Sequence, residues 1–367
     1  MKALVVGGTG PTGPYIVNGL IQRGYQVTIF HRGTHEVPEI PPEVEHIHGD
    51  PHFRETIDEA LAGRTFDLAV VTYGRIRLLA EALVGKIGRF VGIGGVAGYR
   101  GYMQPAHLFP AGLPAPTPES FPLVASEEEL RFSYLIAMTE QVVLEHHPTA
   151  AFFRYPYIYG AYQLVPREWS IIRRILDKRP YIILPDGGLT LATHGYAANM
   201  GHAVLLAVDK PQASAGQVYN CGDEKTLTIR QTVEVITKAM NYQWEILDIP
   251  NAVAIPSRPY AFQETSHHRL MDLFKIKTEL GYSDIVSPEE GLKKTTQWLL
   301  DNRPEPGGEV EKRLLDPFDY ASEDRLAAVF KDSMQRMAAV PFNIDTTRPH
   351  PYAHPKEPGQ QRDHRAR

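Results

Sequence analysis

The sequence has one cysteine, no long hydrophobic run and no excess of basic residues, and each absence excludes a class of protein. A single cysteine, Cys221, excludes an internal disulfide and fits a reducing compartment, where we expect it to be a small buried apolar residue. The early apolar run "ALVV" stops at Gly7, too soon for a signal peptide, and no run approaches the roughly 18 residues of a membrane span. We therefore expect a cytoplasmic protein without membrane contact.

Positive charge is scarce: 38 Lys and Arg residues stand against 43 Asp and Glu residues, giving a net charge of -5 at pH 7. Because nucleic-acid-binding proteins usually carry a basic face, we expect no nucleic-acid partner, although a local basic patch is compatible with this total. The 367 residues exceed the usual size of one domain. With 43% hydrophobic and 22% charged residues, the chain has the composition of an ordinary globular protein.

Apolar runs alternate with helical patterns along the first half of the chain. The expected strands are residues 2–6, 25–30, 66–74 and 89–95. Strands that are apolar throughout and alternate with helices predict a parallel sheet covered on both faces. The predicted fold class is α/β, with a doubly wound parallel Rossmann sheet, a second, smaller α/β substrate domain and a C-terminal extension.

The sequence also predicts where these parts divide. Residues 1–164 are expected to form the dinucleotide-binding Rossmann domain, and residues 165–303 mainly the substrate-binding domain, with crossings back to the first. Residues 304–367 are expected to form the extension, in which 348–367 are disordered or lie across a neighbouring subunit of a possible homodimer. Residues 102–125 are rich in proline and lack a period, as in a long functional loop.

The stretch "VVGGTGPTG" places three glycines three residues apart between the first strand and the first helix. Glycine is required there because the turn is tight and the backbone must approach a diphosphate, whose charge the helix N-terminus stabilises. The position after a strand and before a helix favours this interpretation over a glycine-rich turn without a ligand. The predicted diphosphate-binding residues are Gly7, Thr9, Gly10, Thr12 and Gly13.

The second strand ends in "TIFHRG", where a carboxylate usually accepts a hydrogen bond from an unphosphorylated ribose. His31 and Arg32 stand there instead, and arginine can pair bidentately with a phosphate. This favours NADP over NAD as cofactor, although Arg32 is also compatible with a solvated loop position. Asp50, in "HGDPHF", is a candidate acceptor for the adenine amino group or a helix cap.

Several motifs occur together in a recognisable order: "GGTGPTG", "FRYPYIYGAY", "LPDGG", "THGYAANMGHAV", "YNCGDEKTLT" and "KTELGYSDIVSPEEGLKKTTQWLL". Together they resemble the extended short-chain dehydrogenase/reductase family, and within it the NAD-dependent epimerase/dehydratase branch, over residues 2–303. The resemblance implies a Rossmann domain that holds a nicotinamide cofactor and a second domain that closes over a small molecule, often a sugar nucleotide. The second domain shows no obvious basic pair for clamping such a substrate.

In that family the chemistry uses a Tyr-xxx-Lys pair and a Ser or Thr at the end of the preceding strand. The tyrosine position maps onto Tyr134, but Met138 stands at the lysine position and Gly95, or its neighbour Gly94, at the serine position. Two of the three catalytic groups are therefore missing. The resemblance completes the expected cofactor-binding set with four residues: Tyr73, Gly95, Met138 and Tyr157.

A free phenol has a pKa near 10, so ionising one at pH 7 costs on the order of 4 kcal/mol unless a cation such as the family's lysine assists. Tyr134 is thus better suited to donating a proton than to accepting one, or it only bonds to the cofactor ribose. Two further catalytic candidates are Tyr99, just past a strand, and His194, which also fits a structural turn. Tyr157 is equally compatible with local packing.

Three functions are compatible with these residues. The first is carbonyl reduction of a small organic substrate by NADPH, with Tyr134 or a loop residue as proton donor. The second is an epimerase, dehydratase or lyase that recycles a tightly bound NAD(P). The third is a non-catalytic nucleotide- or RNA-binding protein, because the sequence also resembles the branch of the family that contains chloroplast stem-loop RNA-binding proteins.

No metal site is predicted from the histidines. The pairs His146-His147 and His267-His268 are adjacent in sequence, so the members of each pair do not share a helix face as metal-binding histidines do.

Overall fold

The computed structural model describes residues 1–34, 36–261, 266–343 and 357–359, so the prediction for the tail at 348–367 falls mostly outside the described residues. The chain divides into two compact units, Met1–Phe318 and Asp319–Arg367. The second unit contains one long helix, α11 (Tyr320–Ala338). Among the described residues, no helix is both long enough and apolar enough to cross a membrane.

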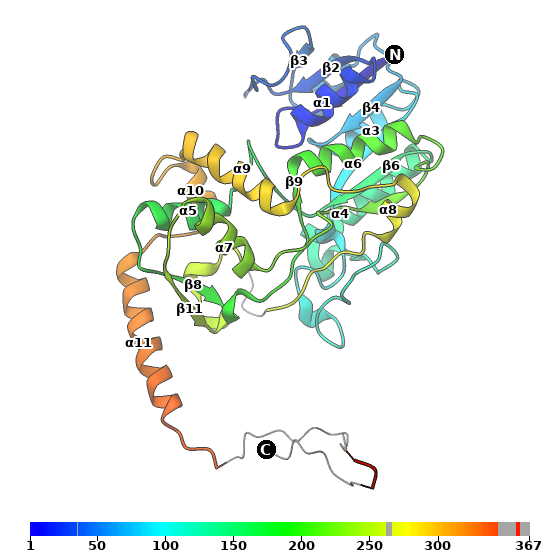
Figure 1. Cartoon of the computed structure of the whole chain (residues 1–367). Coiled ribbons are helices and arrows are strands. Elements are labelled where there is room, and N and C mark those ends of the chain that lie inside the picture. The colour runs from blue at the N-terminus through cyan, green and yellow to red at the C-terminus, as the bar shows by residue number, and fades with distance from the viewer. Residues whose placement is uncertain (35, 262–265, 344–356, 360–367) are drawn as a thin grey trace. The chain divides into compact units, whose positions relative to one another are not determined.

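Seven parallel strands form the central sheet of the first unit (Figure 1), in the order β10-β6-β5-β4-β1-β2-β3. They are β1 (Lys2–Val6), β2 (Gln26–His31), β3 (Glu45–His48), β4 (Leu68–Val71), β5 (Phe90–Gly95), β6 (Ala151–Tyr155) and β10 (Val218–Asn220). The strand order reverses between β1 and β4, and ligands of such sheets bind beyond the carboxyl ends of the strands at that point. The predicted Rossmann sheet is confirmed.

Helices cover both faces of the sheet. One face carries α1 (Gly13–Gln22), α6 (Ala197–Asp209) and α8 (Phe274–Leu280), and the other carries α2 (Arg54–Ala60), α3 (Ile76–Ala82) and α4 (Glu127–His146). Because successive strand residues face opposite sides, Ala3 and Val5 of β1 join the first core, while Leu4 and Val6 join the second. Burial on both sides explains why the strand sequences are apolar throughout.

A smaller group of elements follows in the chain and has its own apolar core. Its helices are α5 (Glu168–Leu176), α7 (Ile229–Ala239) and α9 (Pro288–Asp301). Its strands form two parallel pairs, β8 (Tyr181–Pro185) with β11 (Glu245–Ile249), and β7 (Tyr157–Tyr159) with β9 (His194–Tyr196). Between these elements the chain returns to the central sheet to add α6, β10 and α8.

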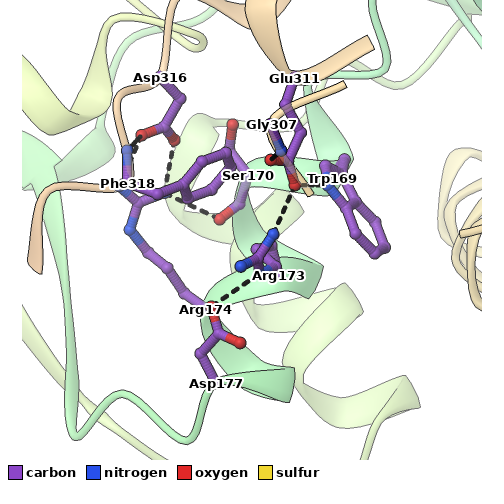
Figure 2. A network of polar contacts seen from close by, with 9 residues as sticks. All are labelled: Trp169, Ser170, Arg173, Arg174, Asp177, Gly307, Glu311, Asp316 and Phe318. Atoms are coloured by element: carbon purple, nitrogen blue, oxygen red, sulfur yellow. Dashed lines mark hydrogen bonds and ion pairs between the residues drawn. The ribbon is translucent and has the colours of Figure 1, made fainter. Parts of the chain in front are cut away.

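The segment after Pro304 is held on α5 by a network of ion pairs (Figure 2), in which α10 (Glu309–Leu314) takes part. Arg174 and Asp316 form a buried bidentate pair at 2.6 and 3.0 Å. Glu311 Oε1 accepts from Trp169 Nε1 at 2.9 Å and from Arg173 Nη1 at 2.7 Å. The first compact unit runs to Phe318 and includes residues 304–318, which the sequence analysis assigned to the extension.

Candidate functional site

A cleft of about 610 Å³ opens beyond the carboxyl ends of β1, β2 and β4. Three groups of residues line it: the turn before α1, the segment after β2, and side chains that approach from β5, β6 and the smaller group of elements. They include Gly7, Thr9, Gly10, Thr12, Gly13, His31, Arg32, Glu36, Thr72, Tyr73, Ile93, Tyr155, Tyr162 and Trp298. Eight of these positions are predicted cofactor-binding residues: Gly7, Thr9, Gly10, Thr12, Gly13, His31, Arg32 and Tyr73.

The turn between β1 and α1 requires glycine at two positions. Gly7 has φ +103°, and a Cβ atom there would overlap the side chain of Thr72. A Cβ atom on Gly13 would overlap the carbonyl group of Gly8, whereas one on Gly10 would meet nothing within 4 Å. The backbone at Gly10 is therefore open to the cleft, directly before the N-terminus of α1, and this arrangement suits a diphosphate.

Arg32 lies at the end of β2 with its guanidinium carbon 5.5 Å from the centroid of the Tyr73 ring. Both side chains line the cleft, so they flank the position that a cofactor ribose takes in this fold. His31 beside them is only 3% exposed. Burial lowers the pKa of His31, and the nearby carboxylate of Glu36 opposes this effect.

Asp50 does not cap a helix, which was one of its two predicted roles. Its Oδ1 accepts hydrogen bonds from the backbone nitrogen and from Nδ1 of His52, at 3.0 and 2.7 Å. Helix α2 begins after Phe53, so Asp50 does not cap it. Asp50 is not among the described residues that line the cleft, and its contact with the adenine stays a prediction.

Tyr134 and Met138 lie one turn apart on α4, where both are partly buried, and neither belongs to the described lining of the cleft. Nη1 of Arg77, on α3, donates to Sδ of Met138 at 2.9 Å, so a guanidinium contacts the residue at the lysine position. At the serine position, a Cβ atom on Gly95 has room, with its nearest neighbour at 3.7 Å, whereas one on Gly94 would press on the Phe152 ring at 2.6 Å. Gly95 is therefore the structural equivalent, and it too does not line the cleft.

Tyr99, a predicted catalytic candidate, has a fully buried side chain. Its hydroxyl donates to Oδ1 of Asn220 at 2.8 Å and accepts from Nη1 of Arg154 at 2.6 Å. Burial raises the pKa of Tyr99 to about 12, although Arg154 opposes the shift. A phenol held in this way has no described access to a ligand.

Tyr157 and His194 line two small adjoining cavities, of about 60 and 40 Å³, instead of the cleft. The Tyr157 hydroxyl donates to the carbonyl of Val165 at 2.6 Å, and its ring lies 3.9 Å from the guanidinium carbon of Arg167. Tyr157 is not among the described residues that line the cleft, and its role as a cofactor ligand stays a prediction. Burial, assisted by Arg167, lowers the pKa of His194 to about 3, so its imidazole is neutral at pH 7.

Other functional candidates escaped the sequence analysis. Arg167 and Arg269 line one cavity together, although the sequence suggested no basic pair. Glu168, at the neighbouring cavity, is buried, its Oε2 lacks a hydrogen-bond partner among the described residues, and burial raises its pKa to about 7. Tyr162 donates to Oε2 of Glu39 at 2.7 Å and lines the cleft with Trp298, its neighbour at 5.3 Å between ring centroids. Only the fold brings these residues together.

Histidines also gather where none was expected to bind a metal. His31, Glu36, His46 and His48 place one ligand atom each within 4.8 Å of one another. The adjacent pairs His146-His147 and His267-His268 are not part of this group. The alternation His-x-His on a strand, beside a histidine that ends the neighbouring strand, is the signal that the sequence analysis missed.

No family model matches the sequence. An uncharacterised protein of Escherichia coli (strain K12) is 26% identical over 140 residues, which are 33% of this chain and 42% of that protein. The UDP-N-acetyl-alpha-D-glucosaminuronate decarboxylase of Bacillus cytotoxicus is 23% identical over 336 residues, covering 82% of this chain and 98% of the relative. The chloroplast stem-loop binding protein of 41 kDa b of Arabidopsis thaliana is 24% identical over 317 residues, covering 82% and 79%.

The fold of this chain is also similar to the folds of solved structures. The dTDP-glucose 4,6-dehydratase of Bacillus anthracis in complex with NAD has a TM-score of 0.62 at 19% identity, covering 83% of this chain and 97% of that one. The chain has the extended short-chain dehydrogenase/reductase fold. The UDP-glucuronic acid 4-epimerase of Bacillus cereus in complex with NAD, with a TM-score of 0.63 at 17% identity, covers 83% and 100%. The predicted resemblance to the epimerase/dehydratase branch is confirmed.

Proposed function

We propose that the protein is an NAD(P)-dependent enzyme that acts on a sugar nucleotide. In this proposal a hydride is withdrawn from the substrate and later returned to it, around an epimerisation, elimination or decarboxylation. The main support for this proposal is the open backbone at Gly10, before α1, in a cleft large enough for a dinucleotide. The decarboxylase relative and the dehydratase neighbour favour this recycling reaction over the net carbonyl reduction that the sequence analysis placed first.

The residues of the cleft suit a nicotinamide dinucleotide. The turn from Gly7 to Gly13 and the N-terminus of α1 would hold the diphosphate, and Arg32 would lie near the adenosine ribose. Arg32 supports NADP, because it supplies a donor pair for a 2′-phosphate where NAD enzymes usually carry a carboxylate. NAD is the alternative, since both neighbours described above were solved with NAD. The cofactor supplies a hydride acceptor when bound.

Proton transfer is a step for which this chain departs from the Tyr-xxx-Lys pattern of the family that it resembles. No lysine ammonium stands four residues after Tyr134, so we propose that Tyr134 acts as a neutral hydrogen-bond and proton donor to the substrate oxygen. The guanidinium of Arg77 contacts Met138, the residue at the lysine position. A donor at this position suits the return of the hydride, in which the carbonyl oxygen gains a proton.

A second set of residues supports an anionic substrate. Arg167 and Arg269 meet at a cavity in the smaller group of elements, beside the neutral His194. Two guanidiniums at one cavity match the charge and geometry of a diphosphate. The proposal places only the anionic end of the substrate there, because the cavity measures about 40 Å³.

The test compares the amount of product formed with the amount of cofactor supplied. The purified protein is incubated with UDP- and dTDP-linked hexoses and hexuronic acids and with NAD(P)+ at one tenth of the substrate concentration. Product formation by NMR that exceeds the cofactor supply, without net absorbance of reduced nicotinamide, is the expected result. In a parallel assay with NAD(P)H, one molecule of reduced cofactor consumed for each molecule of product would contradict recycling and restore the reductase hypothesis.

A second candidate is supported by the likeness to a chloroplast stem-loop binding protein. The net charge of -5 weighs against it, because phosphate contacts dominate such binding. Fluorescence anisotropy with a labelled RNA stem-loop separates the two: salt-sensitive binding that a dinucleotide does not displace would favour this candidate.

A further inference from the structure

Strand pairing places three histidines on one side of the sheet edge. In the parallel pair β2 and β3, His31 is the register partner of His48, and Ile29 is the partner of His46. Because side chains alternate along a strand, His46 and His48 face the same side, and His31 faces that side as the partner of His48. Glu36, in the segment that leaves β2, folds back onto the same group.

The distances within this group fit a single tetrahedral ion. Nε2 of His31 lies 3.0 Å from Nδ1 of His46. The carboxylate of Glu36 lies 3.8 Å from Nε2 of His31, 3.3 Å from Nδ1 of His46 and 3.6 Å from Nε2 of His48. Ligands bound tetrahedrally at about 2.0–2.1 Å from Zn²⁺ lie about 3.3 Å apart. All four ligand atoms lie within 4.8 Å of one another, so small rotations of the side chains bring them onto one ion.

The burial of these residues also suits a metal. The side chain of His31 is 4% exposed and that of His46 20%, whereas His48 and Glu36 are 58% and 59% exposed. The two inner imidazoles are fixed by the sheet, and the two outer ligands give an ion a route from solvent. Without an ion, His31 and His46 can share only one proton between their facing nitrogens. That hydrogen bond does not account for the position of His48 beside them.

We propose that His31, His46, His48 and Glu36 bind Zn²⁺. Three neutral imidazoles and one carboxylate are ligands that zinc accepts, and a closed four-ligand site is typical of a structural ion. The ion would fasten Glu36 to β3 and so fix the segment between β2 and Glu36, which carries the cleft residues Arg32 and Thr34. Zinc binding at this edge of the sheet does not depend on the proposed function.

The test uses the full chain without an affinity tag, stripped with a chelator and titrated with Zn²⁺ by isothermal calorimetry. We expect one tight site per chain. Loss of a metal ligand should weaken metal binding at least as much as loss of a residue that hydrogen-bonds to a ligand, which lowers metal affinity about 10–100-fold. His46→Ala and His48→Ala should therefore weaken the tight site by about 100-fold or more, whereas His146→Ala, at an exposed histidine of α4, should leave it unchanged.

Cobalt gives a second readout that a purely structural role of the histidines would not produce. Co²⁺ added to the stripped protein should show the intense visible ligand-field bands of a tetrahedral ion, and His48→Ala should lose them. His48 is largely exposed, so its variant stays informative even if His46→Ala fails to fold. The absence of tight Zn²⁺ binding to the wild-type chain, or equal binding by His48→Ala, would overturn the proposal.

Discussion

Nη1 of Arg154, on β6, donates a 2.6 Å hydrogen bond to the hydroxyl of Tyr99. The same guanidinium binds both carboxylate oxygens of Glu140, on α4, at 2.7 Å. The Tyr99 hydroxyl in turn donates a hydrogen bond to Oδ1 of Asn220, on β10. The network thereby joins two strands, a helix and the loop after β5. Its function is structural, because it holds the carboxyl end of the sheet next to the helix that carries Tyr134.

Tyr99→Phe should destabilise the fold without changing cofactor binding. The substitution removes the hydrogen bonds of the buried Tyr99 hydroxyl to Oδ1 of Asn220 and Nη1 of Arg154, at a cost of about 1–3 kcal/mol, although Arg154 keeps its pair with Glu140. Urea denaturation measures the loss, and dinucleotide titration serves as the control. A variant that lost turnover but kept its full stability would restore Tyr99 as a catalytic group.

The sequence predicted the features that local patterns encode. The glycine spacing and the apolar strands around it were enough to place the turn before α1, since strand, turn and helix follow one another directly in the chain. His31 and Arg32 could be placed beside the cleft for the same reason, because β2 is next to β1 in every sheet of this kind.

Long-range contacts could not be predicted in this way. Tyr99 follows β5 and looks available from its position in the chain, but it is buried by partners from β6 and β10. Arg167 and Arg269 are far apart in sequence and meet only because the chain folds back. The histidine group needed the register of β2 against β3, which neither strand shows alone.

Asp316→Ala should be strongly destabilising. It would remove the bidentate partner of Arg174, which is 2% exposed, and breaking such a buried pair costs about 3–5 kcal/mol. The matched control is Asp177→Ala, which breaks the more exposed pair with Arg173 on the same helix and should cost at most about 1 kcal/mol. Equal losses in chemical denaturation would contradict the burial of the Arg174 pair.

The free energy of unfolding should decrease as the pH rises, because Glu168 loses its proton. Its pKa is raised from 4.5 to about 7, so the folded state binds the proton more tightly than the unfolded state. The stability from this group is fully present below about pH 4.5 and is lost as the pH rises through about 7, a change of about 3 kcal/mol.

Glu168→Gln should remove this dependence, because the amide does not titrate. The free energy of unfolding of both proteins is measured by urea denaturation at several values of pH between 4.5 and 8. A difference between them that stays constant over this range would show that Glu168 titrates normally.

Arg32→Glu should change the preference between cofactors. Loss of a charge-assisted pair to a 2′-phosphate costs about 1.5–3 kcal/mol, so NADPH should bind about 10–100-fold more weakly. NADH should bind as well as before or better, since the new carboxylate can accept from a free 2′-hydroxyl. Arg131→Glu, at an exposed position of α4, is the control; NADPH affinity that fell equally in both variants would point to net charge instead of a specific contact.

The central claim is that the turn before α1 holds the diphosphate of a nicotinamide dinucleotide. The most direct test is calorimetric titration of NADPH and NADH into the wild-type protein and into Gly10→Val. A side chain at Gly10 meets no protein atom within 4 Å of its Cβ, so the variant should keep its fold while its side chain takes the space of the diphosphate. The account predicts binding to the wild-type protein and its loss in Gly10→Val with an unchanged melting temperature; no heat from either cofactor with the wild-type protein, or equal binding by Gly10→Val, would contradict it.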